Sequence, residues 1–267
     1  MRARSSSPPA KNRSPDLLAV PECVSMPEDH FGERMAARFD ERYAHKDTPA
    51  VVNPIVDFIA ERAGAGGALE LGVGTGRIAL PLAQRGIPVH GIDLSEAMVA
   101  RLRVKPGAEQ VGVTVGDFAS TTVEGRYTVA YIVANTIMNL TTQDEQVACF
   151  CNAAAHLDPK GCFVVEVLVP GLQRLRPGET FQPFAVERTH LGFDEYDVAR
   201  QGLVSHHYWI EDGKVEVISP PFRYVWPSEL DLMARLAGMT LRERWGGWES
   251  EPFTADSPKH VSVWEKL

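Results

Sequence analysis

Cysteine is scarce in this sequence. The 267 residues include four cysteines, with no Cys-x-x-Cys pair and no histidine at zinc-binding spacing; they are Cys23, Cys149, Cys151 and Cys162. A disulfide framework or a structural zinc site requires such pairs or clusters. We therefore expect four reduced thiols, no bound metal and a cytoplasmic protein.

Long apolar runs and an excess of positive charge are also missing. No segment approaches the ~20 apolar residues that a bilayer-spanning helix needs, and the apolar run at 17–20 is too short for a signal-peptide core. The chain carries 27 Lys and Arg against 35 Asp and Glu, a net charge of -8. An acidic surface repels phosphate backbones. We therefore expect neither a membrane nor a nucleic acid as partner.

A glycine-rich turn follows a short apolar, strand-like segment at residues 68–71. Glycines stand at 72, 74 and 76, and a helix-like apolar pattern continues to Gly86. Glycine permits positive φ and a close approach of backbone to a ligand, and a helix start after such a turn attracts negative charge. A dinucleotide fingerprint needs a glycine at the sixth position of the turn. Arg77 stands there, which argues against a dinucleotide.

The order Glu-x-Gly-x-Gly-x-Gly, from Glu70 to Gly76, resembles motif I of the class I S-adenosylmethionine (SAM) dependent methyltransferases. The resemblance implies that Gly72, Gly74 and Gly76 wrap the methionine part of the cofactor, with Arg77 beside them. It also implies that Glu70 holds the loop from behind and reaches toward the amino group. The implied cofactor is SAM, and the implied product is S-adenosylhomocysteine (SAH).

The second strand-like segment, residues 89–94, has a carboxylate near its end. Asp93 is placed to accept hydrogen bonds from both hydroxyls of a ribose. Ser95 is a candidate helix cap for the residues that follow. Leu94 and Met98 then lie where a flat adenine fits between apolar side chains.

The third and fourth strand-like segments, residues 111–115 and 127–133, also end in polar residues. The resemblance implies that Asp117 binds the adenine amino group and that Phe118 covers the ring. It places Asn135 beside the bound methionine. Four successive strand ends of suitable polarity favour one shared cofactor site.

The N-terminal part divides into two regions. Residues 1–27 are rich in Ser, Pro and Arg, and we expect a disordered tail. Residues 28–63 carry apolar positions at helical spacing, including one every four residues up to Tyr43. These helices either pack on the core or form a lid. As a lid they place Tyr43 against cofactor or substrate.

Alternating strand-like and helix-like segments follow the glycine-rich turn, as a doubly wound parallel sheet requires. After a turn at 158–161, the nearly all-apolar residues 162–169 predict a fifth strand covered on both faces. We expect a Rossmann-like α/β fold with a mostly parallel seven-stranded sheet. Residues 64–170 and 226–267 form its SAM-binding core, which ends in an antiparallel strand pair.

Residues 171–225 lack this alternation. Four strand-like segments follow one another there, over residues 184–189, 193–199, 203–210 and 214–224. Asp212-Gly213 is a two-residue hairpin signal. We expect an antiparallel β insert after the fifth strand, on the substrate side of the core, and a homodimer formed through it.

Glu166 interrupts the fifth strand. A carboxylate inside such a strand is costly unless it is paired. Glu166 therefore either meets a buried partner or faces the substrate pocket. It is a candidate for both substrate binding and catalysis.

Aromatic residues gather in the last quarter of the chain, which holds all five tryptophans. They either fill the interface between insert and core or wall a pocket for a flat or cationic acceptor. Tyr224 and Trp226, at the junction of insert and core, are candidate substrate-binding residues, as is Met138. His206 and His207 are adjacent, so at most one faces the pocket from a strand. Either is a candidate general base, in competition with Glu166 and Tyr43.

The resemblance is to bacterial small-molecule methyltransferases in particular. It implies transfer of a methyl group by in-line displacement, which requires alignment of the acceptor and exclusion of water. We expect an aromatic or heteroaromatic acceptor from specialised metabolism, such as antibiotic biosynthesis, methylated at nitrogen, carbon or oxygen. The alternatives are an amino-sugar N-methyltransferase, an NAD(P)-dependent oxidoreductase and a non-catalytic SAM-binding domain.

Overall fold

The computed structural model describes residues 31–211 and 213–267. The tail expected over residues 1–27, Cys23 within it, and Asp212 of the hairpin signal lie outside the described residues. The α-helices and short 3-10 helices (η) are, in chain order, α1 (Glu33–Arg42), η1 (Ala44–Lys46), α2 (Pro49–Ala63), α3 (Ala79–Gln84), α4 (Glu96–Arg103), η2 (Ala108–Gln110), η3 (Thr136–Asn139), α5 (Gln143–His156), η4 (Leu172–Arg174) and α6 (Pro227–Leu236).

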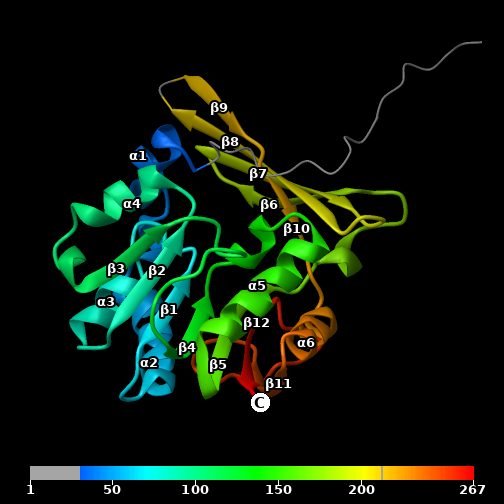
Figure 1. The fold of residues 1–267 in the computed structure, drawn as a ribbon. Helices are drawn as coiled ribbons and strands as arrows, with labels where there is room; N and C mark the ends of the chain where they lie inside the picture. Colours follow the sequence, from blue (N-terminus) through cyan, green and yellow to red (C-terminus); the bar gives the residue numbers. More distant parts are fainter. Residues whose placement is uncertain (1–30, 212) are drawn as a thin grey trace, which may run out of the picture.

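The strands form two sheets (Figure 1). The larger sheet has seven strands in the order β11-β12-β5-β4-β1-β2-β3. Its members are β1 (Ala68–Leu71), β2 (Val89–Asp93), β3 (Val111–Val115), β4 (Tyr127–Ile132), β5 (Leu157–Leu168), β11 (Met239–Trp245) and β12 (Lys259–Lys266). β1 to β5 pair in parallel, whereas β12 runs antiparallel to both β5 and β11. The predicted Rossmann-like fold is confirmed.

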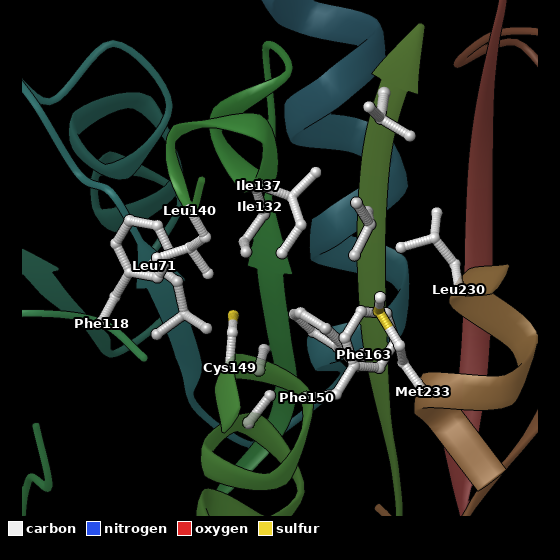
Figure 2. Close-up of a cluster of buried hydrophobic side chains, with 14 of the residues drawn as sticks. Leu71, Phe118, Ile132, Ile137, Leu140, Cys149, Phe150, Phe163, Leu230 and Met233 are labelled. Carbon is white, nitrogen blue, oxygen red and sulfur yellow. The ribbon is translucent and has the colours of Figure 1, made fainter. Parts of the chain in front are cut away.

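Helices cover both faces of this sheet, because its strands are apolar on both sides. Leu69, Leu71 and Phe163 point toward α5 and α6 in one core cluster, where the Phe150 and Phe163 rings meet at 5.0 Å (Figure 2). The neighbouring strand residues, such as Ala68 and Val164, point toward α2 and α3 in a second cluster. This alternation along each strand holds the carboxyl ends of the strands along one edge.

Two helix starts have the caps that fix them. Ser95 Oγ accepts a hydrogen bond from the backbone N–H of Met98 at 3.1 Å, so α4 begins directly after the end of β2. Thr142 and Glu145 form a reciprocal capping box at the start of α5. α3 begins only at Ala79, which puts Pro81 in its first turn, where no backbone donor is required.

The fifth strand differs from its prediction. β5 begins at Leu157, which pairs with Tyr127, and pairing resumes with Cys162 opposite Val129. The expected turn at 158–161 therefore interrupts the strand instead of preceding it. Lys160, at φ 67°, supplies the left-handed backbone for this interruption.

The smaller sheet is the predicted antiparallel insert. Its strands are β6 (Phe181–Val186), β7 (His190–Asp197), β8 (Gly202–Glu211), β9 (Lys214–Ile218) and β10 (Pro221–Arg223). The single strand expected over residues 214–224 is wrong: it divides into β9 and β10, which pair with opposite ends of β8. Pro220 lies at the division, and a proline cannot donate to a strand ladder.

Figure 1 shows the insert above the carboxyl ends of the parallel strands, with α1 beside β8 and β9. Cys149, Cys151 and Cys162 are free thiols, as expected. Among the described residues, no helix has the length and apolarity to cross a membrane. The same residues contain no group of three or more His, Cys, Asp or Glu side chains able to hold a metal ion.

Candidate active site

A cavity of about 450 Å³ lies between the carboxyl end of β4, the α1–η1 segment and one face of the insert. Its lining combines all three parts of the fold: Phe31, Met35, Phe39, Arg42, Tyr43, Lys46, Arg77, Ala134, Asn135, Thr136, Met138, Asn139, Leu168, Phe184, Asp194, Leu203, Ser205, His207, Trp209, Ile218, Pro220 and Phe222. A cavity of this size suits a small molecule.

The glycine-rich turn after β1 comes directly before Arg77, which lines the cavity. Gly72 has a φ of 83°, and a Cβ atom there would lie 2.5 Å from Thr136 Cγ2, so only glycine fits. Gly74 has a φ of 53°, and a Cβ atom there would meet no atom within 4 Å. This open space beside the backbone is where a SAM molecule can approach. The turn therefore fits the cofactor that motif I implies.

Glu70 lies behind this turn. Its side chain is 2% exposed, and Glu70 Oε2 accepts a hydrogen bond from the Tyr131 hydroxyl at 2.9 Å. Burial raises the pKa of Glu70 to about 8, against the lowering effects of the Tyr131 hydrogen bond and the Arg77 charge. A carboxyl in this state gains a proton from solution unless a cation, such as the amino group of SAM, comes close.

Asp93 lies at the end of β2 and holds two loops together. Its Oδ2 accepts from the Gly74 backbone N–H at 2.7 Å, and its Oδ1 accepts from the Ser95 backbone N–H at 2.9 Å. Burial raises the pKa of Asp93, and these two backbone hydrogen bonds oppose that rise. Beside it, Leu94 is 62% exposed whereas Met98 is buried.

The next two strand ends place their residues differently. Asp117 is exposed and accepts a hydrogen bond from the Ala119 backbone N–H at 2.8 Å. Phe118 is 8% exposed and packs in the core cluster near Leu140 (Figure 2). Asn135 has a left-handed backbone and lines the cavity, while its Oδ1 accepts from the Leu168 N–H at 2.8 Å.

The α1 helix is fastened over the glycine-rich turn. Thr75 Oγ1 donates to Asp40 at 2.6 Å, and Ser95 Oγ donates to the Phe31 carbonyl at 2.6 Å. Tyr43 follows the helix and lines the cavity, and burial raises the pKa of its hydroxyl. Arg77 lies opposite it and donates to the Lys46 carbonyl at 3.4 Å.

The insert resolves the choice between the two adjacent histidines. His207 lines the cavity, whereas His206 lies on the other face of β8, hydrogen-bonded to Ser219 Oγ at 2.9 Å and to Glu195 at 3.1 Å. His207 Nδ1 lies 3.0 Å from His190 Nε2. The structure therefore brings His207 and Tyr43 to one cavity and leaves His206 outside it.

Glu166 has a charged partner, Lys259, but this partner is not buried: its side chain is 44% exposed. Its Oε1 accepts from Lys259 Nζ at 2.7 Å, and its Oε2 accepts from the Ala134 backbone N–H at 2.9 Å. Burial opposes ionisation of Glu166, but Lys259 and these hydrogen bonds lower its pKa overall. Glu166 is therefore an ionised carboxylate that holds the loop after β4 beside the cavity, and it is not among the residues that line it.

The three other candidate substrate-binding residues are separated. Met138 is buried and lines the cavity. Tyr224 is 1% exposed and packs on Tyr196, with ring centroids 5.8 Å apart, so it belongs to the core beneath the insert. The Trp226 ring meets Tyr224 edge-on at 6.4 Å and lies outside the cavity lining.

Beside the predicted His207, the cavity has polar or aromatic residues that the sequence did not indicate, among them Arg42, Asp194, Ser205 and Trp209. Ser205, His207 and Trp209 occupy every second position of β8, so their side chains lie on the same face of the sheet. Asp194 of β7 pairs with Ser205 and lies on that face too. Arg42 closes the end of this row, 5.1 Å above the Trp209 ring. The alternation of side chains along residues 203–209 was the available signal.

Comparison with known proteins identifies the family. Residues 68–161 match a family described as a methyltransferase domain. The structure of the methyltransferase CcbJ from Streptomyces caelestis matches with a TM-score of 0.82 and 38% sequence identity, and the match covers 90% of this chain and 99% of CcbJ. The chain belongs to the class I SAM-dependent methyltransferases.

Two more distant matches are a methyltransferase related in sequence and a solved structure that shares the fold. The cypemycin N-terminal methyltransferase of Streptomyces sp. is 27% identical over 203 residues, which cover 74% of this chain and 82% of the relative. SAM-bound CalS10 from Micromonospora echinaspora, an amino pentose methyltransferase, has a TM-score of 0.62 at 19% identity and shares the fold over 81% of this chain and 90% of its own. The SAM-dependent methyltransferase predicted from motif I is confirmed.

Proposed function

We propose that this methyltransferase transfers the methyl group of SAM to a nitrogen atom of a small-molecule amine. The observation that carries the proposal is the continuity of one cavity. Its lining runs from Arg77 and Asn135, beside the glycine-rich turn, to His207 and Trp209 on the insert. An acceptor bound against the insert therefore lies near the glycine-rich turn, in a volume too small for a folded macromolecule.

The residues of the chain provide binding and alignment. SAM, when bound, supplies a methyl group on a positively charged sulfur. Asp93 is assigned to the ribose and Glu70 to the amino group, with the open side of Gly74 facing the cofactor. Tyr43 and α1 act as a lid that excludes water, and His207 is the candidate proton acceptor on the opposite wall.

Nitrogen is favoured as the methylated atom by the relatives. The cypemycin enzyme is named an N-terminal methyltransferase and CalS10 an amino pentose methyltransferase. The aromatic lining fits an amine attached to a ring, because Phe222 and Trp209 offer flat apolar faces. An amino sugar or an aromatic amine of bacterial specialised metabolism, including antibiotic biosynthesis, meets both conditions.

A phenol or an electron-rich ring carbon is the second candidate acceptor. The specific observation in its favour is the His207 imidazole in the cavity, because a phenol must lose a proton early. The two candidates differ in their response to a base: methylation of an oxygen depends on His207 more strongly than methylation of a neutral amine.

Calorimetric titration with SAM and SAH, followed by transfer of a radiolabelled methyl group to a panel of amines, phenols and alcohols, tests the proposal. We expect micromolar or tighter cofactor binding and methylated amines in the product. Methylation of phenols alone contradicts the choice of nitrogen, and absence of SAM binding contradicts the whole proposal.

The insert also supports a finer proposal, on the assembly of the enzyme. β6 is an edge strand with exposed Phe181, Phe184 and Val186, and such an edge favours pairing with another copy. We propose a homodimer through this edge, in a cytoplasmic enzyme. Light scattering should give twice the chain mass of 29.4 kDa for the wild type. The Val186→Lys variant should have the mass of a single chain.

A further inference from the structure

Asp194 differs from the other charged residues of the cavity. It is the one acidic side chain among the described residues that line the cavity. Its Oδ1 accepts a hydrogen bond from Ser205 Oγ at 2.7 Å, which fixes the carboxyl on the insert wall. Within the described part of the chain, no Lys, Arg or His lies within ion-pair distance of it.

The three cations that line the same cavity have their contacts with groups other than Asp194. Arg42 pairs with Glu216 and lies over the Trp209 ring. Lys46 Nζ lies 5.0 Å above the Tyr43 ring, and Arg77 Nε lies 3.7 Å from Asp47. None of these three cations lies within ion-pair distance of Asp194, so the one carboxyl of the lining is available to a cation that enters the cavity.

The surroundings of Asp194 are those of a cation site. Burial raises the pKa of the Asp194 carboxyl, and the Ser205 hydrogen bond and the His206 charge oppose that rise. A carboxyl that is costly to ionise alone gains most when a cation enters beside it. The aromatic rings of Phe184, Trp209 and Phe222 line the same cavity, and aromatic faces also attract ammonium groups.

We propose that Asp194, held by Ser205, is the binding site for an ammonium group of the acceptor. The acceptor is then a primary or secondary amine that enters as a cation, with its ring or apolar part against the aromatic wall. Its nitrogen passes a proton to water or to His207, which lines the same cavity, and the neutral amine then attacks the methyl group. This inference rests on the proposed function and deepens it, because it names the charge of the substrate and the residue that selects it.

The test uses a simple cationic probe and its neutral counterpart. Binding of benzylamine and benzyl alcohol is measured by calorimetry at pH 8 on the full chain saturated with SAH. We expect Asp194→Asn to weaken benzylamine binding at least tenfold, as loss of a hydrogen bond to a charged group implies, and to leave benzyl alcohol binding unchanged. The matched control is Glu195→Gln, the same loss of charge one residue away, on the face that meets His206.

The controls separate this inference from the proposed function. Ser205→Ala keeps the carboxyl but loses its orientation, so we expect an intermediate loss of benzylamine affinity, and this variant serves if Asp194→Asn fails to fold. Unchanged SAH affinity shows that each variant is folded. Equal benzylamine affinity in the Asp194 and Glu195 variants overturns the inference, as does a wild-type protein that binds benzylamine no more tightly than benzyl alcohol. Failure of SAH to bind the wild type instead overturns the proposed function.

Discussion

His190 Nε2 and His207 Nδ1 lie 3.0 Å apart, with their ring planes only 3° from parallel. One nitrogen of this pair must carry a proton and the other must lack one, so the two rings cannot both be imidazolium ions without losing the bond. The His190 ring also stacks on Trp209 at 3.8 Å, beneath Arg42. The protonation of the cavity wall is therefore linked to a residue of α1.

Replacing Arg42 should change the titration of His190. Burial, and then the positive charge of Arg42, lower the pKa of His190, while Glu187 raises it. Arg42→Gln should therefore raise the pKa of His190, measured by NMR of the labelled imidazole nitrogens. Arg38→Gln is the control. Arg38 lies one turn before Arg42 on α1 and pairs with Glu211 of β8, so this variant removes the same charge from the same helix. Identical His190 titrations in the two variants would disprove the link.

Glu70 should make the cofactor-free protein less stable as pH rises. Its pKa is about 8 in the folded state against 4.5 ordinarily, so folded Glu70 holds a proton that the unfolded chain releases between these values. The free energy of unfolding should fall across that window, by at most about 1.4 kcal/mol per pH unit from this group. Urea unfolding at pH 5, 6.5 and 8 should show a shallower fall in Glu70→Gln. The exposed Glu249→Gln should retain the wild-type dependence, and so should Glu70→Gln if the assignment is wrong.

Asp93→Ala should weaken SAM binding by about 1.5–3 kcal/mol, the value of a hydrogen bond to a charged group. The variant loses the assigned ribose contact and the bond that holds the Gly74 N–H. Calorimetry with SAM measures the effect, with the exposed Asp256→Ala as control. Equal SAM affinity in both variants would rule out the ribose assignment.

Glu216→Gln should loosen α1. Arg42 is 5% exposed and pairs with Glu216, which is 21% exposed, so the variant leaves a buried guanidinium with only the more distant Glu211, at 4.0 Å. Hydrogen exchange in α1 should accelerate about tenfold or more, as loss of a charged hydrogen bond implies. Glu211→Gln should have a smaller effect, because Glu211 is 49% exposed and its ion pair is weakened by solvent. A larger effect of Glu211→Gln would show that Glu211 fastens the helix instead.

Local patterns in the sequence were sufficient to predict the helices and strands of the part that is expected to bind the cofactor. The α2 and β1 segments and the cap at Ser95 follow from residues within one or two turns of each other. The bond between Glu166 and Lys259 spans 93 positions and exists because β12 returns beside β5. No local pattern indicates such a partner.

The residues of the insert that line the cavity were harder to predict, for a related reason. In the sequence, Asp194 cannot be distinguished from any other polar residue of a strand. In the structure, it lies on the same face of the sheet as Ser205, and that face lines the cavity. Which face turns inward depends on how the insert packs, and that is a tertiary property. The break at Pro220 was readable, because proline inside an expected strand is itself a warning.

The chain leaves the seven-stranded sheet after β5 and rejoins it through α6. The wall that carries Asp194, His207 and Trp209 is consequently one continuous insert between the parts of the chain that form the seven-stranded sheet. Exchange of this insert between relatives offers a modular route to new acceptors, in which donor chemistry is inherited and selectivity is transplanted.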